Sequence, residues 1–249
     1  RRFNVSNISP IDGRYKKSVS ELGEYFSEQA LMRHRVMVEV KYLLALVEHK
    51  SFKKTRFLSK KTFTSLKNLY VDFSLKDFKQ IKKIEEKTNH DVNAVVVFIS
   101  EKLKKAGRED LVPLVHFGLT SEDVNNTAYS LMTKGAVDNI MIPSIKSVLK
   151  ELKTLSKKTK SLPLLSLTHG QPATTTTLGK ELTVFISRVE RELALIKKMR
   201  LLAKFSGATG SYAAHKIAFP GFSWSVFSNL CLDRVPACGR RVQLRQERS

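Results

Sequence analysis

Apolar residues recur every three or four positions along most of this chain, which is the period of an amphipathic α-helix. The pattern predicts a long first helix over residues 21–49 and a second over 60–73. Ser74 then offers a side chain that can cap a third helix, and a fourth runs up to Gly107. These segments predict a small helical domain over residues 1–110.

The helices lengthen after a connection over residues 107–118. One is predicted from Thr120 onward, bent or restarted near Pro143. The clearest apolar stripe follows, in steps of three and four over five turns, and we expect it to lie in the core. It comprises Leu178, Leu182, Phe185, Ile186, Val189, Leu193 and Ile196. No strand pair stands out, so we predict an all-α fold in which residues 111–228 begin a long-helix bundle.

The end of the chain differs in its use of basic residues. Residues 1–228 contain 29 Lys and 10 Arg, whereas residues 229–249 contain five Arg and no Lys. Such a switch indicates a divergent Arg-rich tail, which a shift of reading frame or another artefact would explain. A short basic tail is the alternative, and 21 residues do not separate the two.

The formal net charge of +21 admits two classes of anionic partner. Clustered Lys and Arg would bind nucleic acid, but here the lysines are spread over most predicted helices and no nucleic-acid recognition motif occurs. A positive field also concentrates small anionic substrates. We therefore do not expect nucleic acid to be the main partner.

Other compositional features narrow the setting. No run of 18 apolar residues occurs, which argues against a membrane span. The chain has two cysteines, Cys231 and Cys238, and so no disulfide framework. A cytoplasmic location is the expectation. Neither metal-ligand spacing nor a glycine-rich phosphate loop is present, so no cofactor is predicted.

Two polar clusters interrupt the apolar pattern in the first half. SPIDGRY at residues 9–15 places Arg14 beside Tyr15 in a turn, where the guanidinium suits phosphate or carboxylate. An exposed turn without a ligand is the alternative. Asn89, His90 and Asp91 stand at a helix start, which favours anions. Simple capping of the helix explains them as well.

Two more clusters follow. Thr120 and Ser121 in GLTSEDVNN are anion ligands or plain helix caps. The two asparagines that end this motif are poor helix formers, which indicates that their side chains make specific contacts. Thr168, His169 and Gln171 lie in LTHGQPA, where an imidazole beside Gly170 could act as general acid or base. A histidine that merely satisfies loop backbone is the alternative.

Together the four clusters resemble the fumarase/aspartase superfamily, and within it the adenylosuccinate lyases. SPIDGRY, NHDV, GLTSEDVNN and LTHGQPATTTTLGKE occur in that family's order and at its spacing, over residues 6–228. The resemblance implies an anti β-elimination of fumarate from adenylosuccinate and from the succinylocarboxamide intermediate of purine synthesis (SAICAR). A catalytically silent, basic helical protein that binds nucleotide or nucleic acid is the alternative.

The resemblance also implies roles for individual residues. His169 would be the general acid, and Arg14 and Tyr15 would bind the nucleotide phosphate. The remaining substrate-binding positions would be Asn89, His90, Asp91, Thr120, Ser121, Thr168 and Gln171. No metal site is implied.

One departure from the family is clear. Its base is a serine on a loop of the type SSxMPxKxNP, and no Met in this sequence is followed by Pro. Family members are homotetramers whose active sites combine residues from three subunits. We therefore expect this chain to be truncated before the serine loop and to be inactive by itself.

Overall fold

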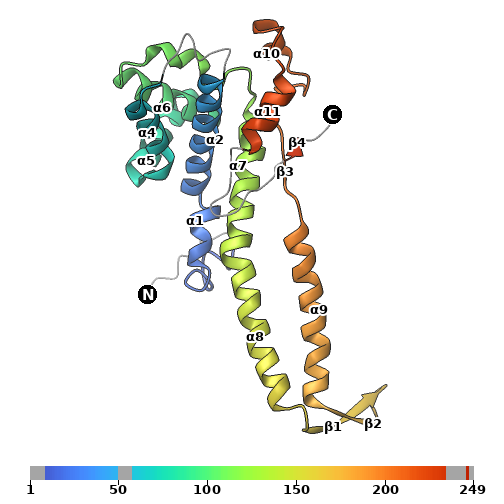
Figure 1. Ribbon diagram of the computed structural model, residues 1–249. Helices are drawn as coiled ribbons and strands as arrows, with labels where there is room; N and C mark the ends of the chain where they lie inside the picture. Colours follow the sequence, from blue (N-terminus) through green and yellow to red (C-terminus); the bar gives the residue numbers. More distant parts are fainter. Residues whose placement is uncertain (1–8, 50–57, 234–244, 247–249) are drawn as a thin grey trace, which may run out of the picture. The chain divides into compact units, whose positions relative to one another are not determined.

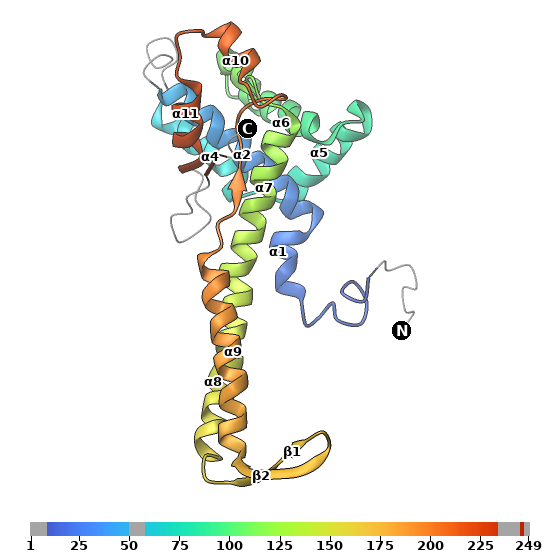
Figure 2. The ribbon, with the colours of Figure 1, turned by 90° about the vertical axis from the view of Figure 1, so that its right-hand side faces the viewer.

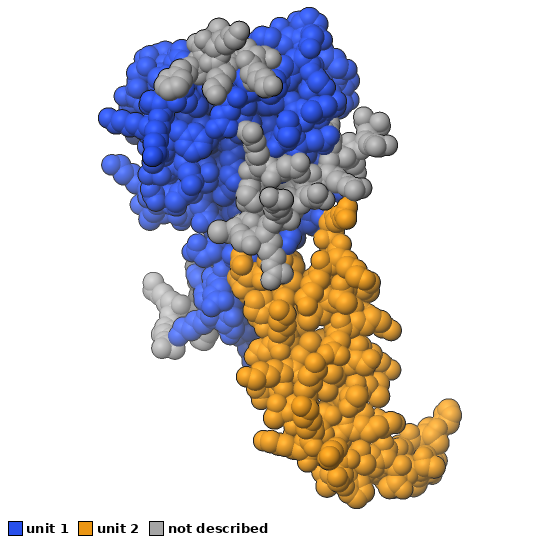
Figure 3. Space-filling view, in the orientation of Figure 1, with its two compact units in different colours: residues 1–135, 201–249 blue, residues 136–200 orange. Residues whose placement is uncertain are grey.

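The computed structural model describes residues 9–49, 58–233 and 245–246. Helices dominate these residues, as the all-α prediction required (Figure 1). The chain divides into two compact units, one of residues 1–135 with 201–249 and the other of residues 136–200 (Figure 3). The predicted domain boundary near residue 110 lies inside the first unit.

The first unit contains most of the helices and a short strand pair. Its α-helices are α1 (Gly23–Phe26), α2 (Glu28–Glu48), α4 (Lys60–Val71), α5 (Leu75–Thr88), α6 (Asp91–Lys105), α7 (Ser121–Ala136), α10 (Ala213–Ala218) and α11 (Trp224–Asp233). Strands β3 (Leu202–Ala203) and β4 (Arg245–Gln246) pair in parallel. Two 3₁₀ helices, Ser20–Leu22 and Glu109–Leu114, complete the unit.

Helix α2 forms the centre of this unit and packs against α4, α5 and α6 (Figure 2). Fourteen of its 21 residues are buried, so most sides of the helix are covered. The single long helix predicted for residues 21–49 is broken at Ser27, whose backbone is extended at φ −72° and ψ 159°. The Ser27 hydroxyl accepts a hydrogen bond from the Ala30 N–H at 3.1 Å, which starts α2 afresh.

The predicted helix boundaries hold at most other positions. Ser74 caps α5 in a capping box with Asp77, and α6 ends two residues before Gly107. The connection expected over residues 107–118 contains the 3₁₀ helix with Pro113 inside it. The helix that follows begins at Ser121.

The second unit is an antiparallel pair of helices, α8 (Ile142–Lys158) and α9 (Leu178–Lys198), which pack along their length (Figures 1 and 2). A π-helical turn (Val137–Met141) runs directly into α8, whose first turn contains Pro143. Met141 and Ile142 both have right-handed helical backbone, so the helix does not restart there, and the irregularity near Pro143 is the π turn. Leu149, Ile186 and Leu193 form the buried contact. Phe185 belongs to the predicted core stripe but is 57% exposed, so the core prediction is wrong for that residue.

A β-hairpin joins the two helices of the second unit and corrects the prediction that no strands pair. Strands β1 (Pro163–Thr168) and β2 (Gln171–Thr177) pair in antiparallel register. Their leucines and β-branched threonines favour extended backbone. The turn between them is His169–Gly170, which is outside the usual hairpin-turn dipeptides and so gave no signal.

No helix in the described ranges is long and apolar enough to cross a membrane. The sequence likewise has no apolar run as long as a membrane-spanning helix.

The close approach of α8 and α9 yields a stability prediction. A Cβ at Gly179 would lie 2.7 Å from the Lys160 Cα and closer still to the Ser156 carbonyl oxygen. Gly179→Ala should therefore lower the free energy of unfolding by about 1–3 kcal/mol, because backbone rather than a flexible side chain must move. Urea unfolding followed by circular dichroism measures this.

Gly23→Ala is the matched control, because nothing lies within 4 Å of its added Cβ. Its φ of −58° is helical, so that variant should be neutral or stabilised by up to about 1 kcal/mol. Equal destabilisation of both variants would contradict the packing argument.

His34 yields a pH prediction. Burial lowers the pKa of His34 to about 4, the Ala30 carbonyl opposes this through a hydrogen bond, and Arg33 adds to it. The unfolded chain, with a pKa near 6.5, therefore binds the proton more tightly, and stability falls as the pH drops from about 6.5 toward 4. Wild type should lose about 2 kcal/mol from this group between pH 7.5 and pH 5, and His34→Gln should lose correspondingly less in the same urea titrations.

Candidate functional site

Arg14 and Tyr15 lie in the exposed turn that precedes the first helices. The Tyr15 N–H donates to the Pro10 carbonyl at 3.0 Å, which closes the turn. The Arg14 guanidinium stands over the Tyr15 ring, 5.6 Å from its centroid. Tyr15 is 49% exposed. Both side chains are thus presented to solvent, as an anion-binding role needs.

The second cluster stands where α5 gives way to α6. Asn89 ends α5 with a left-handed backbone at φ 50°. His90 caps α6, its Nδ1 accepting from the Asn93 N–H at 3.2 Å. Capping therefore accounts for one nitrogen of His90, and half of its side chain remains exposed.

Asp91 is held by its own helix and by α2. Its Oδ1 accepts from the Val92 N–H at 2.8 Å, and its Oδ2 accepts from Arg35 Nη2 at 2.6 Å. Partial burial raises the pKa of Asp91, but the Val92 hydrogen bond and the Arg35 charge together lower it below its ordinary value. Asp91 is thus a fixed carboxylate and not a proton donor at neutral pH.

Arg35 joins the second cluster to the third. Besides Asp91 it contacts Asn125, whose Oδ1 accepts from Arg35 Nε at 2.9 Å. The Arg35 side chain is only 4% exposed. This buried guanidinium fixes the start of α6 against α7, so the structure brings residues 89–91 and 120–126 together.

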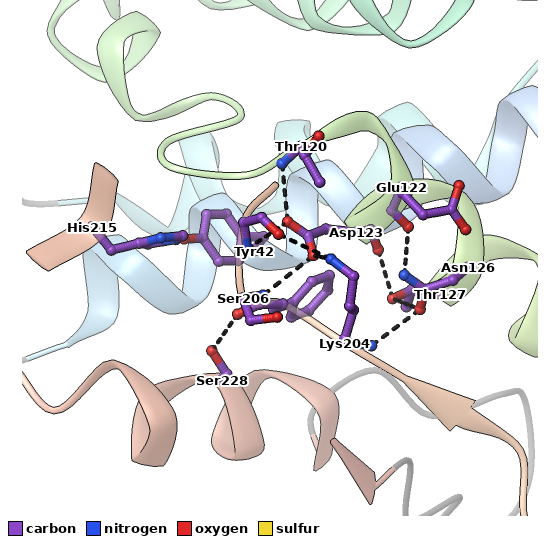
Figure 4. A network of polar contacts seen from close by, with 12 residues as sticks. Tyr42, Thr120, Glu122, Asp123, Asn126, Thr127, Lys204, Ser206, His215 and Ser228 are labelled. Atoms are coloured by element: carbon purple, nitrogen blue, oxygen red, sulfur yellow. Dashed lines mark hydrogen bonds and ion pairs between the residues drawn. The ribbon is translucent and has the colours of Figure 1, made fainter. Parts of the chain in front are cut away.

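The third cluster is organised by Asp123, which is fully buried. One carboxylate oxygen accepts from Lys204 Nζ at 2.7 Å and from the Ser206 N–H at 3.2 Å. The other accepts from the N–H groups of Thr120 at 2.9 Å and Gly207 at 3.0 Å. Figure 4 shows these contacts converging on one carboxylate. Asp123 therefore ties the start of α7 to residues 204–207.

The asparagines after Asp123 are used, as their poor helix propensity suggested. Asn125 binds Arg35. Asn126 Oδ1 accepts from the Lys204 N–H at 3.0 Å (Figure 4). Both contacts are structural. Thr120 precedes α7, Ser121 is its first residue, and both are half-buried.

His116 and Glu39 form a pair that the sequence did not reveal. Glu39 Oε1 lies 2.5 Å from His116 Nδ1, and Glu39 Oε2 accepts from the His116 N–H at 3.2 Å. Burial lowers the pKa of His116, but the Glu39 hydrogen bond and charge, with Asp123 nearby, raise it above its ordinary value. The pair lies immediately before the third cluster, and its imidazole is partly exposed.

His215 lies against the same loop from the other side. Its Nε2 is 3.1 Å from the Tyr42 hydroxyl, which donates to the Phe117 carbonyl at 2.9 Å (Figure 4). The imidazole packs against Trp224 at a centroid distance of 4.6 Å, with the ring planes inclined by 57°. A Cβ at Gly118 would lie 2.6 Å from this ring. His215 is therefore a packed side chain that supports the backbone of residues 117–118.

The fourth cluster belongs to the second unit. His169 and Gly170 form the two-residue turn of the hairpin, both with left-handed backbones at φ 49° and 75°. This is the conformation of a type I′ turn, which glycine adopts without strain and histidine does not favour. Thr168 and Gln171 pair across the turn. All four residues are exposed.

Sequence reasoning found three of the four clusters at structured helix or strand ends but missed the groups that hold them. Those groups are Arg35, Glu39 and Lys204. The burial of Asp123 was missed as well. A signal did exist for two: Arg35 and Glu39 are charged residues one turn apart in the otherwise apolar run of α2, and a buried charge needs a partner. Nothing in the sequence indicated Lys204, because it pairs with a carboxylate 81 positions away.

The comparisons with known proteins define the class of protein. The model of a lyase family matches residues 13–239. The chain belongs to this family, as the resemblance to the fumarase/aspartase superfamily predicted. Among solved structures, β-carboxy-cis,cis-muconate cycloisomerase from Acinetobacter calcoaceticus aligns with a TM-score of 0.68 at 20% identity, over 92% of this chain and 49% of that one. This likeness concerns the fold.

Curated relatives are more similar in sequence. Adenylosuccinate lyase of Dictyostelium discoideum is 44% identical over 230 residues, which cover 90% of this chain and 49% of the relative. The Escherichia coli K12 adenylosuccinate lyase is 39% identical over 226 residues, with coverages of 90% and 50%. The chain therefore spans about half the length of the curated relatives it matches.

The carboxylate at the centre of Figure 4 gives a prediction. Asp123→Asn removes a buried charge, leaves Lys204 unpaired and places an amide NH₂ against backbone donors. We expect the free energy of unfolding to fall by about 3–5 kcal/mol, measured by urea titration.

Glu122→Gln is the matched control, because Glu122 is the exposed neighbour on the same helix turn. It should change stability by no more than about 0.5 kcal/mol. A small effect of Asp123→Asn would show that the carboxylate does not hold this loop.

Proposed function

We propose that this chain is part of an adenylosuccinate lyase, which eliminates fumarate from adenylosuccinate and from SAICAR. The support is twofold. Relatives with that name are 39–44% identical over 90% of the chain, and His169 is presented on an exposed, left-handed hairpin turn. The identity over most of the chain is the observation that carries the assignment, and the exposed left-handed turn supports the role of His169 because it presents the imidazole to solvent.

In the reaction a base removes a proton from the carbon next to a succinyl carboxylate, and the electron pair left on carbon forms the double bond of fumarate. The bond from carbon to the purine nitrogen breaks, and an acid protonates that nitrogen. His169 supplies this proton, since an imidazole delivers protons near neutral pH. The base in this family is a serine on a loop of the type SSxMPxKxNP, and no Met among residues 1–249 is followed by Pro.

Cations and hydrogen-bond donors of the first unit account for substrate binding. The substrate carries a phosphate and carboxylates, and the net charge of +21 attracts such an anion. Arg14 and Tyr15 are exposed and bind the phosphate. Asn89, His90 and Asp91 with Thr120 and Ser121 hold the rest of the nucleotide, and Thr168 and Gln171 act beside His169.

His116 is a candidate that we add to this set. Its raised pKa extends the cationic form of the imidazole to higher pH than in a free histidine. Because this charge is lost as the pH rises through that pKa, it contributes to the affinity for an anion below the pKa and not above it.

The same proposal covers assembly and location. We infer a cytoplasmic homotetramer whose sites combine residues of three subunits, as in the family. Such an assembly is consistent with a second unit that exposes large apolar side chains in the described structure. They include Val148, Leu155, Phe185 and Leu195.

His169 provides the test. In the protein that contains this chain, His169→Ala should lower kcat for adenylosuccinate cleavage by about 10²–10⁴-fold, with a smaller change in KM. The loss of adenylosuccinate absorbance measures the rate.

Imidazole added to the buffer should restore part of the His169→Ala rate, because a diffusible acid replaces the missing side chain. Asp123→Asn serves as the comparison, since a structural defect gains nothing from imidazole. Undiminished activity of His169→Ala would assign the proton transfer to another group.

A further inference from the structure

One side of the α8–α9 pair is strongly basic. Two hollows of about 610 and 670 Å³ lie between the helices. Cations line the first, together with a single carboxylate, Glu190. They are Lys146, Lys150, Lys153 and Lys157 of α8 and Lys197 of α9.

The second hollow combines cations with hydroxyl groups. Lys160, Lys180 and Arg188 line it. Ser156, Thr183 and Ser187 stand among them. Lys and Arg with Ser and Thr are the side chains that proteins use to contact phosphate oxygens.

Helix periodicity places the two hollows on one side of the pair. On α8 the lysines follow each other at intervals of four, three and four residues, and Lys160 continues the series at three. On α9, Lys180, Thr183 and Ser187 lie on the same face as Glu190 and Lys197. The two hollows therefore follow one another on one side of the pair, and we call them together the basic groove. Lys146 and Lys160 mark a length of about 21 Å at 1.5 Å per residue.

Little inside the molecule neutralises this groove. Glu190 pairs with Lys153 at 2.5 Å and Glu181 with Lys180 at 3.1 Å. Within the described residues Lys146, Lys150 and Lys157 have no ion-pair partner. Like charges at three- and four-residue spacing destabilise a helix, so an anionic ligand along the groove would relieve a repulsion built into α8.

The apolar side of the same helix pair is a separate surface. Val148 and Leu155 of α8 and Phe185 of α9 are 46–57% exposed there. Helices of a bundle pack against apolar faces. Any further helix of the bundle would therefore cover the apolar side of this pair and leave the basic groove open to solvent.

The lining favours a phosphate chain over an acidic protein. The floor residues Leu149 and Leu193 are already 95% buried in the helix pair, and the lining contains no aromatic side chain. The groove therefore offers neither the apolar centre of a protein interface nor a platform for stacking bases. We propose that it binds the phosphodiester backbone of single-stranded nucleic acid without reading the sequence.

The basic side chains are less evenly distributed in the fold than in the sequence. The lysines are spread along the sequence, but the fold gathers eight Lys and Arg side chains along one groove. A space between two packed helices is too narrow for a duplex, so a single strand is the form that fits.

The test measures binding of a fluorescein-labelled 20-nucleotide oligo-uridylate to the 249-residue chain by anisotropy at several salt concentrations. The triple variant Lys146→Gln, Lys150→Gln and Lys157→Gln should bind roughly tenfold more weakly at low salt. The slope of log affinity against log salt should shrink by about 2, at about 0.7 per lost phosphate contact. Labelled oligo-deoxythymidylate should behave alike.

The matched control carries Lys76→Gln, Lys79→Gln and Lys83→Gln on exposed positions of α5. It has the same net charge, so its affinity should fall less than about twofold. Equal losses in the two variants would reduce the effect to net charge and overturn the proposal. So would displacement of the RNA by poly-glutamate or inorganic polyphosphate at lower charge concentration than by unlabelled RNA.

A measurement on the unaltered chain guards against a folding defect in the variants, whose melting is checked by circular dichroism. Photocrosslinking with a 4-thiouridine oligonucleotide should modify peptides within residues 142–198. Crosslinks confined to other residues would contradict the groove. In the protein that contains this chain, adenylosuccinate cleavage is expected to be unaffected by all six substitutions, so the outcome is independent of the proposed enzymatic function.

Discussion

The carboxylate of Asp123 is the contact on which the polar part of the first unit depends. It is fully buried, and a buried charge is tolerated only when it is paired and hydrogen-bonded. Three backbone N–H groups and Lys204 meet that requirement. Because those donors come from both sides of the second unit in the sequence, this one carboxylate joins residues 120–123 to residues 204–207 and fixes the loop that begins α7.

Arg35 and Glu39 extend the same principle along α2. Each is a charged group within an apolar helix, and each binds a candidate site element: Arg35 binds Asp91 and Asn125, and Glu39 binds His116. The role of these pairs is positional, since a buried helix cannot shift without breaking them. Candidate ligands on loops thereby acquire fixed positions from a rigid core.

The second unit follows different rules. Its two helices are held by a small buried contact and by a close approach at Gly179, and a hairpin with a turn at His169–Gly170 joins them. The helix pair has one apolar side and one basic side. The apolar side suits the bundle of the lyase family, whereas the basic side has no role in the proposed elimination. One helix pair thus carries surfaces for two classes of partner.

The sequence by itself determined the helices, their caps and the family, because period, capping and motif spacing are local properties. It placed Arg14, His90, Thr120 and His169 at turns or helix starts. Tertiary structure alone decided the rest. The break at Ser27, the strand pair around His169, the Lys204–Asp123 pair and the gathering of lysines into one groove depend on residues that meet only when the chain folds, and no local pattern encodes which partner a buried charge will find.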